Sequence, residues 1–234
     1  MPLGEASVVQ CSKTAHTLLQ HLGTIMERLP TLLVLASTPC IAKAEASTAP
    51  HIASTHSALS AFDTLDSTLR LGLASGLPIL LVAPKTIGAQ ARKLLSGNSV
   101  IDLPEYESNK LEPTDCFAQA VVTGVLSSAN SNGWLLLPAN TPMLKTDTLK
   151  RVAEAMTTQS VVYPQYRQIP GNPIGFSSEF FSELIRMQTE RDFSRLIARY
   201  PAQGIDVDDP GILLGMSQTR NFTNPSRNQI QAFN

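Results

Sequence analysis

Residues 134–149, WLLLPANTPMLKTDTL, contain the pattern that decides the fold. Trp134–Pro138 is a continuous apolar run, which is typical of a strand covered on both faces of a sheet. A polar turn follows it, and Thr146–Met156 then has a helical pattern, with Asp147 in the first turn, where the helix dipole favours an acid. This stretch therefore predicts one strand, turn and helix of an α/β sheet.

The same alternation extends in both directions from this stretch. Further strands are predicted at Thr31–Ser37, Pro78–Ala83, Gly97–Leu103 and Ser160–Pro164, the third being the weakest run, with a short extended piece at Gln203–Val207. Helices are predicted at Ser57–Ser75, Ala118–Ala129, Ser178–Met187 and Arg191–Tyr200. Within Tyr163–Phe176 we expect a strand, a turn at Pro170–Pro173 and a returning strand. Together these elements predict an α/β fold, with a mostly parallel sheet and helices on both faces.

The chain divides into three parts. Residues 1–30 predict an amphipathic helix whose apolar seam alternates steps of three and four residues and ends before Pro30. This helix either packs on its own domain or, through residues 7–29, forms a homodimer or binds a protein partner. Residues 31–222 form the main domain, and residues 223–234 form a polar tail.

Composition and charge exclude several classes of function. Eighteen Lys and Arg against 19 Asp and Glu give a net charge of -1, so no basic excess is available for nucleic-acid binding. The longest apolar stretch, Leu71–Pro84, is shorter than the roughly 20 residues that a membrane span needs, and the N-terminus lacks a basic signal-peptide region. The three cysteines are too few and too far apart for a disulfide framework or a zinc site. We therefore expect a cytoplasmic protein that binds neither nucleic acid nor membrane.

Three segments follow predicted strands and are candidates for a binding site. They are residues 36–43, residues 138–142 and the turn at residues 170–173. In open α/β sheets, ligands bind beyond the carboxyl ends of the strands, where such segments meet.

The order of these segments resembles the MobA-like nucleotidyltransferases, which include the enzymes that transfer GMP or CMP to molybdopterin. Residues 134–149 are similar to that family's strand ending in Asp-Met-Pro and the helix after it. Residues 161–176 are similar to its strand, Gly-His-Pro turn and strand, and residues 206–222 to its closing segment, which has acids before Pro-Gly. The resemblance covers residues 32–222. It implies a Rossmann-like three-layer sandwich of the nucleotide-diphospho-sugar transferase type, here with an extra N-terminal helix.

The resemblance also implies a reaction, in which a phosphate of a small acceptor attacks the α-phosphorus of a nucleoside triphosphate and releases pyrophosphate. In the family, backbone N–H groups of a loop hold the triphosphate, and acids hold Mg²⁺ against it. Carried over by position, the resemblance implies that the nucleotide-binding residues are Leu35, Ala36, Ser37, Thr38 and Pro84. It implies that the catalytic residues are Asn140 and Lys43, and that Asn140 is also at the metal position. The implied acceptor-binding residues are Arg167, Gly171, Asn172 and Arg195.

Several of the family's catalytic positions carry other residues here, so the motifs are degenerate. The loop at residues 35–44 has no glycine, and the family's metal-binding aspartates fall on Asn140, Gly215 and Ser217. Asn172 replaces the histidine of the turn. Asp208, Asp209 or Asp115 could substitute as a metal ligand, although acids in turns more often have no such role.

Two hypotheses remain. The chain is either an active nucleotidyltransferase that uses Mg²⁺, or a relative without catalytic activity that binds a ligand or a protein partner.

Overall fold

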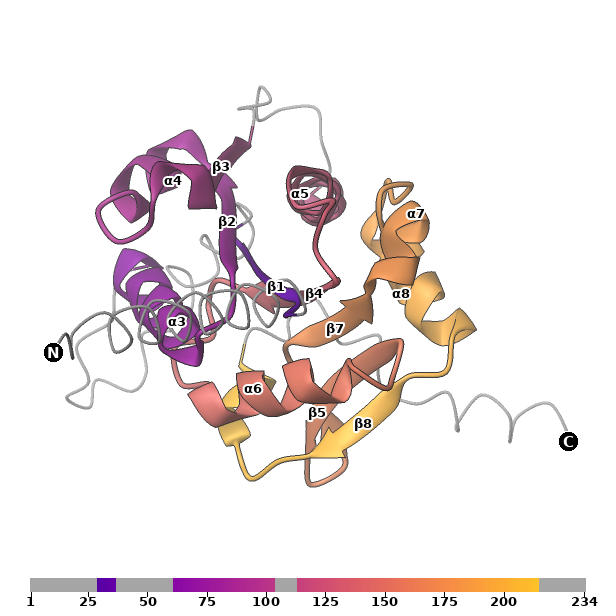
Figure 1. Cartoon of the computed structure of the whole chain (residues 1–234). Helices are drawn as coiled ribbons and strands as arrows, with labels where there is room; N and C mark the ends of the chain where they lie inside the picture. The colour runs from indigo at the N-terminus through magenta and orange to yellow at the C-terminus, as the bar shows by residue number, and fades with distance from the viewer. Residues whose placement is uncertain (1–28, 37–60, 104–112, 215–234) are drawn as a thin grey trace, which may run out of the picture.

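A computed structural model describes residues 29–36, 61–103 and 113–214 of the chain (Figure 1). The predicted N-terminal helix, apart from its last two residues, and the predicted polar tail at 223–234 lie outside the described residues. The division into three parts therefore remains a prediction.

Eight strands of the described part form one mixed sheet. Strands β1, β2, β3 and β4 are parallel, in the spatial order β3-β2-β1-β4, with β3 at one edge of the sheet. Strand β7 is antiparallel to both β4 and β5, so β5 runs in the same direction as β4, and β8 pairs parallel with β5. The strands are β1 (Thr31–Leu35), β2 (Ile79–Pro84), β3 (Val100–Leu103), β4 (Gly133–Pro138), β5 (Val161–Tyr166), β6 (Ile169–Pro170), β7 (Ile174–Ser177) and β8 (Gln203–Asp206).

Helices cover both faces of this sheet, as the continuous apolar strands predict. The longer helices are α3 (Ala61–Ser75), α4 (Lys85–Ala91), α5 (Pro113–Ser127), α6 (Thr146–Ala155) and α8 (Glu190–Arg199), with a single turn at α7 (Phe181–Leu184). Leu32 and Val34 of β1 pack with α3 and α6, whereas Leu33 and Leu35 pack with α5. The three-layer α/β fold predicted from the sequence is confirmed.

The two cores differ in the side chains that fill them. The core on the α3 and α6 face is largely aliphatic. The core on the α5 and α8 face contains a chain of aromatic rings, in which Phe193 of α8 lies 5.1 Å from Phe117 and 5.8 Å from Phe176. This aromatic packing holds α8 against the sheet.

Three details of the prediction need correction. The helix α4 was not predicted, and the region Ser178–Met187 is a 3-10 turn (Ser178–Phe180) followed by α7, not one helix. The hairpin turn lies at Arg167–Gln168, between β5 and β6, not at Pro170–Pro173. Both turn residues have positive φ, 52° and 65°, which is the backbone of a type I′ turn and matches the twist of paired strands.

Residues 170–173 have another role in the fold. The strands β6 and β7 pair with the same side of β5, because β8 occupies the other side at the same residues, Val162 and Gln165. Between these two strands, the segment Gly171–Pro173, which contains a cis bond at Pro173, interrupts the pairing. This segment therefore lies within the sheet, beside the end of β4.

In the described part of the chain, we find no helix that is both long enough and apolar enough to cross a membrane.

Candidate functional site at the carboxyl edge of the sheet

The parallel strands place their last residues at one edge of the sheet, which we call the carboxyl edge. Leu35 of β1 is paired with Val82 of β2 and Pro138 of β4. The backbone N–H of Ala139 then donates to the carbonyl oxygen of Leu35 at 3.0 Å, and that of Ala36 donates to Val82 at 2.9 Å. The predicted nucleotide-binding residues Leu35 and Ala36 are thus fully buried ladder residues at this edge.

Pro84, the third of these residues within the described part, ends β2 at the same edge and precedes α4. The remaining two, Ser37 and Thr38, lie outside the described residues, as do Lys43, Gly215 and Ser217. Residues 35, 36 and 84 therefore form one corner of the candidate site.

The segment after β4 is held by two buried threonines. The hydroxyl of Thr68, on α3, lies 3.0 Å from the carbonyl oxygen of Ala139 and 2.9 Å from that of Thr64. The hydroxyl of Thr141 donates to the carbonyl oxygen of Pro138 at 2.9 Å. These contacts fix the backbone on both sides of Asn140.

Asn172 lies at the same edge as Asn140. The antiparallel register pairs Leu136 with Ile174, and two further steps along it bring Asn172 to the level of Pro138. The backbone N–H of Asn172 donates to Ile212 at 2.9 Å, and the side chain is 1% exposed. The structure thus places the predicted catalytic residue Asn140 and the predicted acceptor-binding residue Asn172 at the same edge of the sheet.

Both asparagines have a buried amide atom without a hydrogen-bond partner among the described residues. These atoms are Oδ1 of Asn140, an acceptor, and Nδ2 of Asn172, a donor. A buried polar group that makes no hydrogen bond costs about 1–3 kcal/mol, so such groups usually have a partner, either in the protein or in a ligand. One unpaired donor and one unpaired acceptor at the same edge are suited to a polar ligand.

Gly171 is required here by close packing. A Cβ atom at this position would lie 2.5 Å from the carbonyl oxygen of Ile212 and 2.7 Å from its side chain. Its backbone N–H donates to Pro164 at 2.9 Å. Gly171 therefore allows residues 210–213 to pack against the segment that carries Asn172.

A buried carboxylate, Asp209, clamps this closing segment to the start of α6. Its Oδ2 accepts from the backbone N–H of Lys145 at 2.8 Å and from the hydroxyl of Thr148 at 2.6 Å, and its Oδ1 accepts from the N–H of Gly211 at 2.9 Å. The neighbouring Asp208 is exposed, and its carbonyl oxygen accepts from the ammonium of Lys145. Asp209 thus has a complete set of structural partners.

This arrangement bears on the metal that the fold family implies. The described residues contain no group of three or more His, Cys, Asp or Glu that could hold a metal ion. Of the candidate ligands in the described part of this edge, Asn140 offers a neutral oxygen, both oxygens of Asp209 already accept hydrogen bonds, and Asp208 offers a single exposed carboxylate. Mg²⁺ in proteins is usually bound through one or two carboxylates as well as substrate phosphates. The described residues therefore do not fit a Mg²⁺ site that the protein alone would form.

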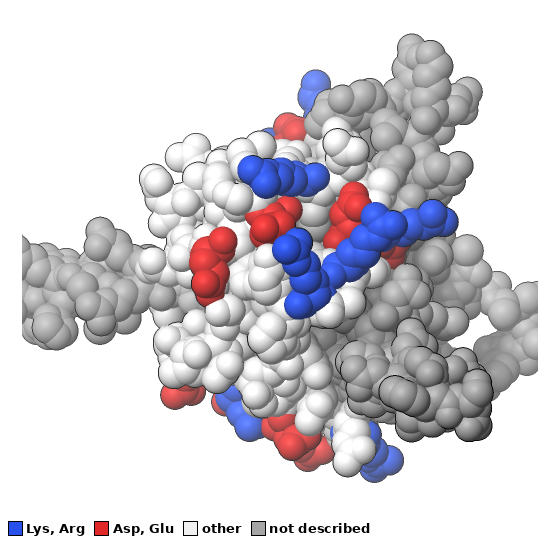
Figure 2. Space-filling view, turned by 90° about the vertical axis from the view of Figure 1, so that its right-hand side faces the viewer, with Lys and Arg blue, Asp and Glu red and all other residues white. Residues whose placement is uncertain are grey.

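The two arginines of the predicted acceptor site are exposed. Arg167 is exposed at the tip of the β5–β6 hairpin, with its guanidinium 5.1 Å from the ring centroid of Tyr166. Arg195 is on the outer side of α8, where it forms an ion pair with Asp192 at 3.6 Å and lines a groove with Arg186 and Arg199. On the face shown in Figure 2, acidic and basic side chains are interleaved. The roles assigned to both arginines remain predictions.

The sequence pattern does not identify Thr68 or Thr148 as parts of this edge. Both are buried, at 0% and 3% exposure, and each contacts a residue more than 60 positions away. A threonine on the apolar face of a predicted helix was the one available signal, because such a hydroxyl needs a buried acceptor.

Comparisons with known proteins agree with this fold. Residues 99–204 match the family model of the MobA-like NTP transferase domain. Among solved structures, the manganese complex of the Rv0371c protein of Mycobacterium tuberculosis H37Rv is similar, with 19% identity, a TM-score of 0.55, and coverage of 76% of this chain and 88% of that one. No curated protein sequence matches this chain significantly.

Two further structures have the same fold. A nucleotidyl transferase of a Methanothermobacter species is 13% identical, with a TM-score of 0.52, and the match covers 78% of this chain and 88% of that one. The 4-diphosphocytidyl-2C-methyl-D-erythritol synthase of Anaerococcus prevotii is 9% identical, with a TM-score of 0.55, and the match covers 83% and 93% of the two chains. These likenesses confirm the nucleotide-diphospho-sugar transferase fold.

Proposed function

Since residues 99–204 carry a MobA-like NTP transferase domain, we propose that this chain binds a nucleoside triphosphate at the carboxyl edge and transfers its nucleotidyl group to a small phosphorylated acceptor. The observation that supports this proposal best is the pair of unpaired amide atoms at this edge, Oδ1 of Asn140 and Nδ2 of Asn172. By the resemblance in sequence, these two residues correspond to the family's aspartate and histidine.

The two amides suit different parts of such a ligand. The Nδ2 of Asn172 donates, so it can bind a phosphate oxygen of the nucleotide or of the acceptor. The Oδ1 of Asn140 only accepts, so it can bind a sugar hydroxyl or a base N–H group. Both groups lie on rigid backbone, so they can orient a ligand without first becoming ordered themselves.

A second candidate function is ligand binding without transfer. It is favoured by the charge at this edge, because Asn140 is neutral and Asp209 is fully engaged in the clamp. A site in which Asn140 is neutral and Asp209 is engaged retains hydrogen bonding to a nucleotide but has less negative charge to hold a cation against the phosphates. On this hypothesis the chain is a binding or interaction subunit, which could dock through residues 7–29.

Nucleotide binding is tested by thermal unfolding with ATP, GTP, CTP and UTP, each with and without Mg²⁺. A ligand present at 100 times its Kd adds about 2.7 kcal/mol, which raises Tm by roughly 5–10 °C for a domain of this size. We expect a shift with at least one nucleotide, and about tenfold weaker binding for Asn140→Ala and Asn172→Ala, since each loses one hydrogen bond of about 1–1.5 kcal/mol.

The matched control is Asn98→Ala, because Asn98 is exposed and lies in the 3-10 turn that precedes β3, at the opposite edge of the sheet. Absence of a shift with all four nucleotides would refute the proposal. So would binding that is unchanged in both amide variants.

Transfer is tested separately by pyrophosphate release from the nucleotide that binds, in the presence of small phosphorylated acceptors. If the chain is an active transferase, Asn140→Asp should preserve or raise Mg²⁺-dependent turnover, because a carboxylate returns to the family's metal position. In the same case, Ser37→Pro should abolish turnover. Binding without pyrophosphate release in either the wild type or Asn140→Asp would favour the second function.

A further inference from the structure

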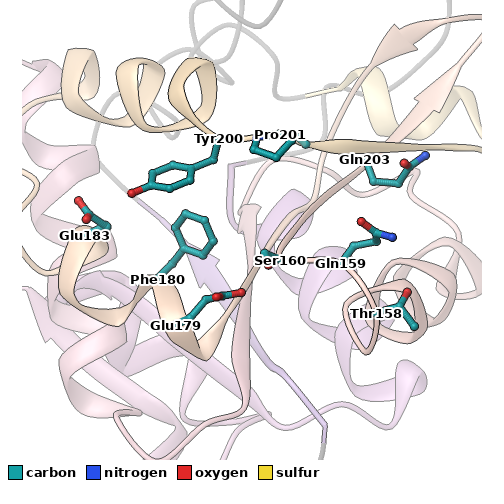
Figure 3. A pocket seen from close by; sticks show the side chains of 10 residues that line it. Thr158, Gln159, Ser160, Glu179, Phe180, Glu183, Tyr200, Pro201 and Gln203 are labelled. Carbon is teal, nitrogen blue, oxygen red and sulfur yellow. The ribbon is translucent and has the colours of Figure 1, made fainter.

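A cavity lies at the opposite edge of the sheet from the candidate site. It has a volume of about 400 Å³ and is formed by three segments: the turn before β5, the 3-10 turn and α7 after β7, and the chain between α8 and β8 (Figure 3). Its lining residues are Thr158, Gln159, Ser160, Glu179, Phe180, Glu183, Tyr200, Pro201, Ala202 and Gln203. No function has been assigned to it above.

The wall of this cavity includes two carboxylates and aromatic surface. Glu179 and Glu183 lie on one side, with the rings of Phe180 and Tyr200 between them (Figure 3). These two rings are 4.8 Å apart and nearly perpendicular, at 81°, so they support each other. No Lys or Arg is among the lining residues.

Glu179 is held as a carboxylate. Hydrogen bonds from the hydroxyls of Ser160 and Ser177, the latter at 2.7 Å, lower the pKa of Glu179 below its ordinary value. Neither Glu179 nor Glu183 forms an ion pair with a described Lys or Arg. The residues that line the cavity therefore include two carboxylates and no Lys or Arg, while Arg186, Arg195 and Arg199 line the adjoining groove with Glu183.

The far side of the cavity adds an amide acceptor. The Nε2 of Gln203 donates to the carbonyl oxygen of Gly204 at 2.9 Å, which leaves its Oε1 free to accept. Gln159 lies beside Gln203 on this side (Figure 3). A ligand that fits the whole cavity must therefore donate several hydrogen bonds, carry positive charge and contact aromatic rings.

We propose that this cavity binds a ligand that carries a guanidinium group. A guanidinium is planar, presents five donors in a fork that matches a carboxylate, and stacks on aromatic rings. An ammonium group has the charge but neither the planar fork nor the stacking surface. Nearby, Arg199 already places its guanidinium 5.6 Å from the centroid of the Tyr200 ring, so that ring accepts this group.

The proposal is tested by isothermal titration at low salt with N-butylguanidinium and its neutral analogue N-butylurea. We expect the cation to bind at least ten times more tightly than the urea. In the Glu179→Gln/Glu183→Gln variant, we expect the affinity for the cation to fall at least tenfold, because both carboxylates are lost. The matched control is Glu154→Gln, since Glu154 is exposed on α6 and does not line the cavity.

NMR spectra of the full chain locate the site. The cation should shift the side-chain amide resonances of Gln159 and Gln203, and Tyr200→Leu should weaken binding at least threefold without loss of the native spectrum. Equal affinity for the cation and the urea, or unchanged affinity in the double Glu variant, would overturn the proposal.

Two further arms separate sources and sites. Titration with a short acetylated peptide that contains one arginine shows which source of guanidinium the cavity accepts. Binding of the peptide would mean that an arginine side chain of a protein partner fits the cavity. A cavity that binds N-butylguanidinium but not the peptide accepts only free guanidinium compounds. The Asn140→Ala/Asn172→Ala variant should retain guanidinium binding even if nucleotide binding is lost, so the two proposals fail independently.

Discussion

The clamp formed by Asp209 allows a quantitative prediction for Asp209→Ala. The substitution removes the acceptor for two backbone N–H groups, those of Lys145 and Gly211, and for the hydroxyl of Thr148. Each buried donor left without a partner costs about 1–3 kcal/mol, and the Thr148 hydroxyl can turn to another acceptor. We therefore expect a loss of about 3–5 kcal/mol in the free energy of unfolding.

Two related substitutions divide this cost. Asp209→Asn keeps one oxygen, which can serve either the pair of donors at Oδ2 or the single donor at Oδ1, so it should cost about 2 kcal/mol. Thr148→Val removes one donor and leaves the carboxylate with two N–H partners, so it should cost about 1 kcal/mol. The order expected is Asp209→Ala, then Asp209→Asn, then Thr148→Val.

Urea unfolding followed by fluorescence measures these differences. Trp134 is the only tryptophan of the chain, it is fully buried in β4, and its indole N–H donates to the hydroxyl of Ser128 at 3.0 Å, so its emission reports the core. The control is Asp208→Ala, which removes an adjacent but exposed carboxylate and should change stability by less than about 0.5 kcal/mol. If Asp209→Ala costs no more than this control, the clamp does not stabilise the fold.

Four other predictions concern single positions. Gly171→Ala should destabilise the fold by about 1–3 kcal/mol, because the new Cβ would lie 2.5 Å from the carbonyl oxygen of Ile212. The control Gly97→Ala should be nearly neutral, because a Cβ there would have no atom within 4 Å. Equal urea midpoints for the two variants would contradict this packing. Thr189→Ala removes the N-cap of α8 and should cost about 1 kcal/mol, measured by urea unfolding. Asp192 is the other half of that capping box, and hydrogen bonds from the N–H groups of Thr189 and Gln188 lower its pKa from 3.8. Its contribution to stability is therefore present above pH 3.8 and is lost as the pH falls through the lowered pKa. The difference in stability between the wild type and Asp192→Asn should shrink in acid, and a constant difference would refute this role. Gln168→Gly should raise the urea midpoint and add up to about 1 kcal/mol to the free energy of unfolding, because glycine adopts the φ of 65° at this position without strain. The control is the same change at the exposed Gln159, which should give no gain in stability.

Much of the fold could be predicted from short-range pattern alone. The apolar runs at 78–83 and 134–138 lie within one residue of the strands β2 and β4, because a strand covered on both faces must be apolar throughout. The helix α4 could not be found this way, since it has seven residues and Gly88 at its centre. A Cβ at Gly88 would lie 3.2 Å from Val100, so packing on β3 requires the glycine that weakens the helical signal.

The hairpin shows a second limit of local pattern. Pro170–Pro173 has the composition of a turn, and Arg167–Gln168 does not, yet the latter pair makes the turn. The pairing of Gln165 with Pro170 and of Tyr166 with Ile169 leaves two residues for the connection, so the register imposes positive φ on residues that rarely adopt it. Such strain is set by long-range pairing and leaves no mark in the sequence.

The candidate site was predictable only in part. Asn140 and Asn172 could each be assigned to a strand end, but the antiparallel β7 brings them to the same edge, and its direction was not readable from composition. For Asp209, the sequence allowed either a metal ligand or an ordinary turn acid. Its partners at Lys145 and Thr148 are more than 60 residues away, and they make it a structural clamp.

The strand β7 has a consequence for the way the two proposed sites relate to each other. Asn172 lies two residues before its first residue and Glu179 two residues after its last, so one strand of four residues joins the amide pair to the guanidinium cavity. A rigid-body shift of this strand along its axis would displace both sites at once, but its ladder to β4 resists such sliding. Any influence of one ligand on the affinity for the other would therefore have to strain this ladder, and thermodynamic linkage requires that influence to be equal in both directions.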